Sequence, residues 1–233
     1  MSRVVQKSNS HGSLKDIQVL VNNDFHLLNT TIAEQIEDET MKSIQWVSPL
    51  KRDNYAEYRD ESFLELLNVS PQKVPLNKFW PRNGPQWDAL GMAVGQRLIL
   101  LEAKAHIDEL SSQGSSAGKE SLKQITNSLS ETKRFLGVQS DIDWTGTYYQ
   151  YANRVAYLYF LNVLNSIPAF LVSVYFLNDA SVTGPRHKGE WIEAIDKMKL
   201  GLGLVKNPLD KYCREVFIDL EEMKGEAKVR LEV

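Results

Sequence analysis

The segment from Leu98 to Lys104 most constrains the fold, because it is apolar on both sides until it ends in two charges. Side chains of a β-strand alternate between two faces, so Glu102 and Lys104 share a face with the even-numbered leucines before them. A strand that is apolar on both faces belongs in the centre of a sheet. A carboxylate and an ammonium at its buried end are costly unless they meet a partner, a metal or water. We therefore expect this strand end to carry the chemistry of the protein.

A second acid, Asp88, begins the apolar segment that precedes this strand. If the two segments form a hairpin, the loop between them decides which face Asp88 occupies. A two-residue loop places Asp88 opposite Ala103 and away from Glu102. A three-residue loop or a bulge near Gly95-Gln96 places it on the face of Glu102 and Lys104. We predict the longer loop.

Composition limits the class of protein. The chain has 233 residues, of which 42% are hydrophobic, which is enough for one well-buried core. The net charge of −3 provides no global basic field, so any binding of phosphate must be local. The single cysteine, Cys213, cannot form an intramolecular disulfide, and no basic and apolar leader precedes the first helix. We therefore expect a cytoplasmic protein.

Hydrophobic periodicity predicts alternating helices and strands after the N-terminal region. The uncharged stretch from 155 to 178 is interpreted as a buried helix and a buried strand rather than a membrane span, because Asn162, Asn165 and Pro168 interrupt it. The fold class is α/β, with a mixed central sheet flanked by helices. The predicted elements are helices at 54–68, 119–136, 147–164 and 190–200, the hairpin strands, and strands at 169–177 and 215–220.

The N-terminal region predicts one long amphipathic helix. Apolar residues recur at three- and four-residue spacing from Leu14 to Ile36, with Ser13 as a candidate N-cap. We expect this stripe to pack on the core of its own chain or on the same helix of a second subunit, which would make a homodimer. Residues 1–45 are thus expected to form a helical extension, and residues 46–233 an α/β domain, around one core overall.

The pattern of Asp88 followed by Glu102-Ala103-Lys104 resembles the signature of the PD-(D/E)xK nuclease superfamily. Trp87 stands where the family name has proline, but the order of elements from 54 to 220 also agrees. The resemblance implies a restriction-endonuclease-like fold and metal-dependent hydrolysis of nucleic acid, with DNA as the expected substrate. It also implies that the backbone carbonyl of Ala103 is a metal ligand.

The residue types support the same chemistry independently. Mg²⁺ takes oxygen ligands and commonly uses one or two carboxylates, so Asp88 and Glu102 suit it, and Mn²⁺ is an expected substitute. The ion would lower the pKa of a bound water and neutralise charge on the phosphate. Lys104 would position that water or stabilise the transition state, with a pKa that we expect burial and the cation to depress.

Other polar residues are secondary candidates. In the superfamily that the chain resembles, a Gln or a basic residue on the helix after Glu-x-Lys orients the substrate. Gln150 fits this role, with Arg154 on the same side one turn later, although Gln150 could equally be a polar residue satisfied at a helix end. Glu61 resembles an extra acid that some members direct to the metal. His106 could touch phosphate or lie at the surface. Expected substrate-facing cations are Lys78, Arg82, Lys119, Lys123, Lys133 and Arg134.

Three other interpretations remain open. Glu102 and Lys104 could be an ordinary ion pair on a strand. The chain could be a catalytically silent relative that uses a nuclease fold to hold nucleic acid or a protein partner. In the third interpretation, the N-terminal helix is the functional element and pairs subunits or recruits another protein.

Overall fold

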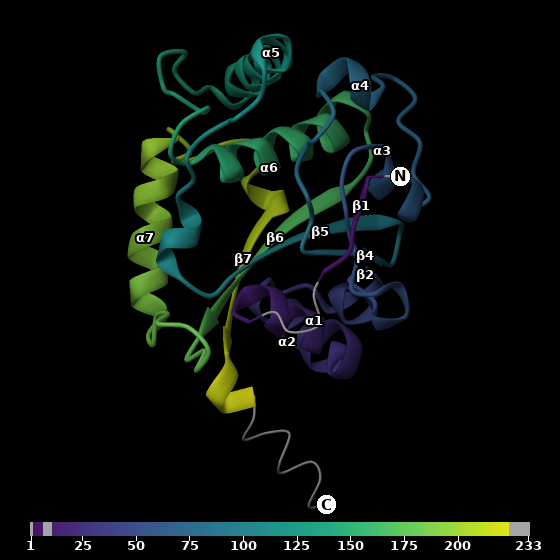
Figure 1. Cartoon of the computed structure of the whole chain (residues 1–233), viewed down its shortest axis with the longest axis vertical. Coiled ribbons are helices and arrows are strands. Elements are labelled where there is room, and N and C mark those ends of the chain that lie inside the picture. The colour runs from purple at the N-terminus through teal and green to yellow at the C-terminus, as the bar shows by residue number, and fades with distance from the viewer. Residues whose placement is uncertain (1, 7–10, 224–233) are drawn as a thin grey trace, which may run out of the picture.

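A five-stranded mixed sheet crosses the centre of the molecule in the computed structural model, which describes residues 2–6 and 11–223 (Figure 1). The strand order is β2-β4-β5-β6-β7, and β2, β4 and β5 are antiparallel while β5, β6 and β7 run parallel. This confirms the predicted mixed α/β architecture. The strands are β2 (Gln45–Ser48), β4 (Ala89–Ala93), β5 (Arg97–Lys104), β6 (Ala169–Leu177) and β7 (Cys213–Asp219).

Helices cover both faces of this sheet, as the buried strands require. Two N-terminal helices, α1 (Ser13–Asn23) and α2 (Phe25–Gln35), pack against Ile99, Leu101 and Ala103. The larger core lies on the opposite face, over Leu98 and Leu100. The period-two alternation predicted for β5 is therefore confirmed. The helices of the larger core are α3 (Glu61–Leu66), α4 (Leu76–Phe79), α5 (Lys119–Leu136), α6 (Tyr149–Tyr159) and α7 (Lys188–Gly201).

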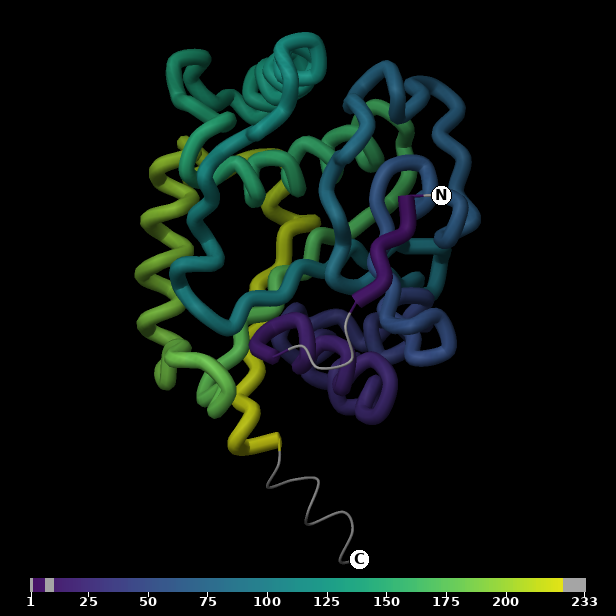
Figure 2. The backbone as a smooth tube through the Cα atoms, in the orientation of Figure 1, coloured from purple at the N-terminus to yellow at the C-terminus, as the bar shows by residue number. Residues whose placement is uncertain are grey.

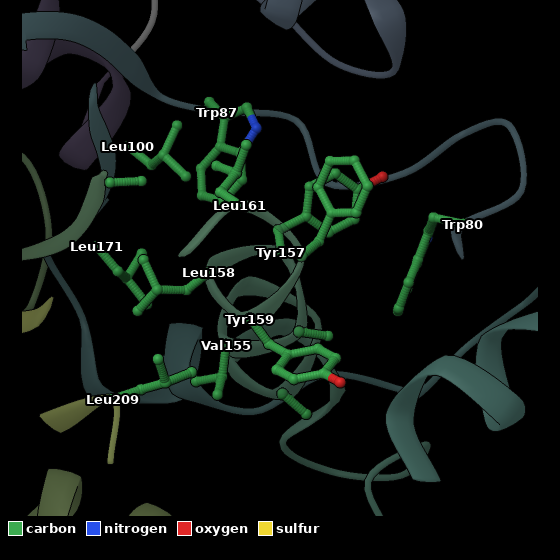
Figure 3. Close-up of a cluster of buried hydrophobic side chains, with 14 of the residues drawn as sticks. Trp80, Trp87, Leu100, Val155, Tyr157, Leu158, Tyr159, Leu161, Leu171 and Leu209 are labelled. Carbon is green, nitrogen blue, oxygen red and sulfur yellow. The ribbon is translucent and has the colours of Figure 1, made fainter. Parts of the chain in front are cut away.

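Helix α6 forms the centre of the larger core. Figure 3 shows Leu158 of this helix beside Leu171 of the sheet, and Val155 beside Leu209. The uncharged stretch predicted as a helix and a strand is the second half of α6, a π-helical turn at Phe160–Leu164, and β6. Within the described ranges, no helix combines the length and apolar character needed to cross a bilayer.

The expectation of one long N-terminal helix is wrong, because the helix breaks between α1 and α2 at Asp24. The Asn22 side chain donates to the carbonyls of Gln18 and Pro49, and its oxygen accepts from the amide of Lys51. Such local side-chain bonds compete with continuation of a helix. The apolar stripe, including Ile17, Val21, Leu28 and Ile32, is buried against the chain's own sheet.

The prediction of a helix over 54–68 is also wrong in its first half. Only α3 is helical there, and β3 (Glu57–Tyr58) pairs instead with β1 (Arg3–Val4). Asn54, Tyr55 and Asp60 have positive φ angles, which are incompatible with a right-handed helix. The smooth trace in Figure 2 shows the N-terminal segment running beside this part of the chain.

The loop of the β4–β5 hairpin decides the register of the candidate site. Ala93 pairs with Arg97, so the loop contains three residues, Val94, Gly95 and Gln96. Gly95 and Gln96 both have positive φ angles, and glycine adopts this conformation without steric cost. The predicted three-residue loop is confirmed.

We expect Leu100→Ala to lower the free energy of unfolding by about 2–5 kcal/mol, because Leu100 is fully buried between β5 and α6. Urea denaturation of the two proteins measures the difference. Val94→Ala is the control, since Val94 is 61% exposed at the hairpin tip and its truncation should change stability little. A similar, small loss in both variants would contradict this description of the core.

Candidate functional site

Asp88 and Glu102 lie on the same face of the sheet at adjacent strand ends. Ala89 pairs with Leu101, so continuing the antiparallel register by one residue sets Asp88 opposite Glu102. Leu90 and Leu100, the next residues on that face, both belong to the larger core. The two carboxylates predicted as metal ligands are therefore neighbours beneath α6.

Glu102 is the centre of this cluster, with only 6% of its surface exposed. Its Oε1 accepts hydrogen bonds from Lys104 Nζ at 2.6 Å and from Gln150 Nε2 at 3.0 Å. Its Oε2 faces Arg154, with Nε at 2.9 Å and Nη2 at 2.8 Å. Burial alone would raise the pKa of Glu102, but the charges of Arg154 and Lys104 outweigh it and lower that pKa. Glu102 is therefore held as a carboxylate.

The α6 helix supplies two of these partners, and they share one side of the helix, as the sequence spacing predicts. Gln150 and Arg154 are four residues apart and present their side chains to the same carboxylate. The Arg154 guanidinium also donates to the Gln86 carbonyl and to the Asn153 side chain, each at 2.8 Å. Its carbon lies 5.0 Å from the centre of the Trp87 ring.

Asp88 is half-buried and is held by the backbone of β5. Its Oδ2 accepts a hydrogen bond of 2.7 Å from the amide of Ala103. The N–H and C=O of one strand residue point to the same edge, so the Ala103 carbonyl is also directed to the Asp88 side. Burial and the neighbouring charge of Glu102 raise the pKa of Asp88 well above its usual value.

Lys104 lies beside Glu102, as the strand alternation predicts, and its pKa in the absence of a cation reflects the two acids. Burial lowers its pKa as expected, yet the charges of Glu102 and Asp88 are stronger, and the net effect raises that pKa. In this arrangement Lys104 is a cation paired with Glu102. Its side chain is also nearly buried.

A third acid, Glu57 of β3, belongs to the cluster, although the sequence analysis did not identify it as a candidate. It is 2% exposed, and its Oε2 accepts hydrogen bonds from the side chains of Gln6 and Gln86. Its Oε1 is buried without a hydrogen-bond partner among the described residues. Burial raises the pKa of Glu57 to about 7, and the charge of Glu102 adds to this effect. A two-residue strand is too short to show periodicity, so no sequence signal marked Glu57.

Two other candidates, Glu61 and His106, lie elsewhere. Glu61 is exposed on α3 and lines a separate cavity of about 770 Å³ together with Asp60, Glu65 and Arg82. His106 is partly exposed, and its Nδ1 accepts from the Asp108 amide.

The predicted substrate-facing cations fall into a buried and an exposed group. Lys133 is buried, and its Nζ donates to the carbonyls of Ser140 and Ile142 at 2.8 Å, so its role is structural. The others, Lys78, Arg82, Lys119, Lys123 and Arg134, are exposed.

The cluster leaves little empty space. A cavity of about 20 Å³ is lined by residues that include Glu102, Lys104, Gln150, Arg154 and Ser173. This is room for roughly one water molecule or ion. Within the part of the chain that the structure describes, no three or more His, Cys, Asp or Glu side chains are grouped so as to hold a metal ion.

The donor set nevertheless fits a hard divalent cation. Three acids, Glu57, Asp88 and Glu102, influence one another's charge, whereas Lys104 and Arg154 provide two positive charges. Burial and the charge of Glu102 favour the neutral form of Asp88, and Glu57 Oε1 has no hydrogen-bond partner among the described residues, so a bound cation would favour the charged form of both acids. Two carboxylates and a carbonyl are ligands that Mg²⁺ accepts while keeping positions for water and phosphate.

Comparisons with known proteins found no match to this chain among family models, curated proteins or solved structures. The functional interpretation therefore stands on the chain's own residues and on the resemblance of its motif.

We expect Glu57 to make stability depend on pH. Its folded pKa, about 7, lies above the ordinary 4.5, so the folded state binds this proton more tightly than the unfolded state. The contribution of Glu57 is therefore fully present below about pH 4.5, and the free energy of unfolding should decline as pH rises to about 7. Urea denaturation across this range measures the slope.

Glu57→Gln, which mimics the protonated acid, should flatten part of that decline. The matched control is Glu193→Gln on α7, where an exposed carboxyl is solvated in both states. A slope that Glu57→Gln leaves unchanged would show that Glu57 does not carry this penalty.

Proposed function

We propose that this protein is a metal-dependent nuclease that hydrolyses phosphodiester bonds of nucleic acid, with DNA as the expected substrate. The observation that carries the proposal is the meeting of Asp88, Glu102 and Lys104 on one face at adjacent strand ends, with the Ala103 carbonyl directed to the same edge. This arrangement resembles the PD-(D/E)xK site from which the expectation arose.

In this proposal Asp88, Glu102 and the Ala103 carbonyl hold Mg²⁺ or Mn²⁺. When bound, the cation lowers the pKa of a water ligand and neutralises charge that develops on the phosphoryl oxygens. Glu57 adds negative charge that favours the cation. It takes the place that the sequence assigned to Glu61, because it is Glu57 that lies within the cluster.

The chain's own groups have distinct tasks. Oε2 of Glu102 is fixed by Arg154, whereas Oε1 is shared by Lys104 and Gln150. A shift of both the Lys104 ammonium and the Gln150 amide away from Oε1 would free that oxygen for the metal and leave the ammonium beside the reacting phosphate. Gln150 then orients the substrate or the attacking water.

The substrate would approach from the Asp88 side. Asp88 is partly exposed, whereas Glu57, Glu102 and Lys104 are buried. The cavity of about 20 Å³ is lined by Glu102 and Lys104 but not by Asp88 and is smaller than a phosphodiester, so the reacting phosphate would bind outside it, beside Asp88. The local cations available to a polyanion include Arg82 and Lys119, both exposed.

We expect Lys104→Met and Glu102→Gln to abolish Mg²⁺-dependent cleavage of plasmid DNA, with a loss of at least ~100-fold for the lysine variant. Gel assays with Mg²⁺, and with a chelator, measure the rate, and circular dichroism checks folding. Lys197→Met on α7 is the control, because Lys197 is exposed. Equal activity in the wild type and both site variants would refute the assignment.

The structure also favours a second candidate, a catalytically silent nuclease-fold protein that binds nucleic acid or a protein partner. Three side chains, Lys104, Gln150 and Arg154, already bind Glu102. If these contacts persist, Glu102 cannot serve as a ligand.

Titration calorimetry with Mn²⁺ separates the two candidates. The nuclease should bind the ion, and Asp88→Asn should remove that binding, because it removes a ligand carboxylate. No measurable binding by the wild-type protein would favour the silent candidate.

A further inference from the structure

We propose that Arg154 is a positioning residue that sets the distance between the Asp88 and Glu102 carboxylates, an inference that rests on the proposed function. Arg154 is 5% exposed, and its guanidinium bonds both to Glu102 of β5 and to the Gln86 carbonyl just before β4. Its role would be exerted through those two acids rather than on the substrate.

The contacts of the guanidinium span the hairpin. Nη2 lies 2.8 Å from Glu102 Oε2 on β5 and donates at 2.8 Å to the Gln86 carbonyl, two residues before Asp88. Nε strengthens the first contact at 2.9 Å, and Nη1 is anchored on Asn153. Because the guanidinium is planar and rigid, these bonds fix the position of the residues just before β4 relative to Glu102.

The residues just before β4 also form hydrogen bonds to β3. The amide of Trp87 donates to the Tyr58 carbonyl at 3.2 Å, and the Gln86 side chain donates to Glu57. The Trp87 ring lies under the guanidinium. Gln86 and Trp87 are therefore held between β3 and Arg154, and Asp88 is the next residue in the chain.

Charge neutralisation alone does not explain these contacts. Lys104 already provides a counter-charge to Glu102 at 2.6 Å, and the Gln86 carbonyl carries no charge to neutralise. A lysine at position 154 would keep the positive charge but could not reach both acceptors with fixed geometry. Arg154→Lys therefore separates a positioning role from a purely electrostatic one.

The first measurement uses the metal-free protein, so that it does not depend on the proposed function. In ¹H–¹⁵N spectra, Arg154→Lys should shift the signals of the Trp87 indole and of the Asp88 amide. Arg97→Lys is the matched control at the other end of β5, where the guanidinium pairs with Asp38 at 2.8 Å and lies over the Phe170 ring. It should leave these two signals in place.

The second measurement is Mn²⁺ affinity by calorimetry. Arg154→Lys should bind the ion about 10- to 100-fold more weakly than the wild type, whereas Arg97→Lys should bind it equally well. Thermal unfolding of each variant separates this loss from lowered stability, since a merely structural role would lower the midpoint and leave the affinity of the folded protein unchanged.

Unmoved Trp87 and Asp88 signals together with wild-type affinity in Arg154→Lys would overturn the inference. If the wild type binds no Mn²⁺, the proposed function fails, and the spectra of the metal-free variants still decide whether Arg154 positions Asp88. Should Arg154→Lys not fold, Asn153→Ala frees only Nη1. It should then produce smaller changes in the same two signals, and their absence would likewise overturn the inference.

Discussion

The buried carboxylate of Glu102 is the feature on which the architecture around the site depends. A central strand can end in a charged residue inside the core only if that charge is compensated, and Lys104 and Arg154 provide the compensation. Removing one partner of such a buried pair costs on the order of 3–5 kcal/mol, because the remaining charge stays buried. The position of α6 across the end of β5 is therefore an electrostatic requirement as well as a hydrophobic one, since that helix carries Arg154 and Gln150.

Three independent structural features bring Asp88, Glu57 and the partners of Glu102 together. The three-residue hairpin loop sets the register that places Asp88 on the face of Glu102. Helical spacing on α6 then directs Gln150 and Arg154 to one carboxylate. Finally, the short pairing of β1 with β3 buries Glu57 beside them. The first two features are local in the sequence, whereas the β1–β3 pairing joins residues 3–4 to residues 57–58.

The excess of acid over base in this cluster links its stability to its proposed chemistry. A site with a raised pKa for Asp88 and an unpartnered Glu57 oxygen is more costly to fold than an apolar core of the same shape. Strongly perturbed pKa values cluster at functional sites, and the proposed cation would favour the charged forms of both acids. The small cavity beside Glu102 is consistent with a site whose partners rearrange when the ligand enters.

Local sequence patterns were sufficient to predict many of the helices and strands. The alternation in β5, the helical period of α5 and the apolar run of β6 each predicted an element that the structure contains. Predictions were wrong where short polar residues changed the backbone, as at Asn22 and Asp24 between α1 and α2. At such positions hydrogen bonds to distant backbone groups outweigh intrinsic propensity.

The sequence by itself determined that Asp88, Glu102 and Lys104 stand at the ends of buried segments, because apolar patterning and strand period depend only on neighbouring residues. Only the tertiary structure decided that Glu57 joins them and Glu61 does not, and that Lys104 is paired with Glu102. These outcomes depend on through-space charge and on burial by segments far apart in the chain. Linear spacing carries no information about either.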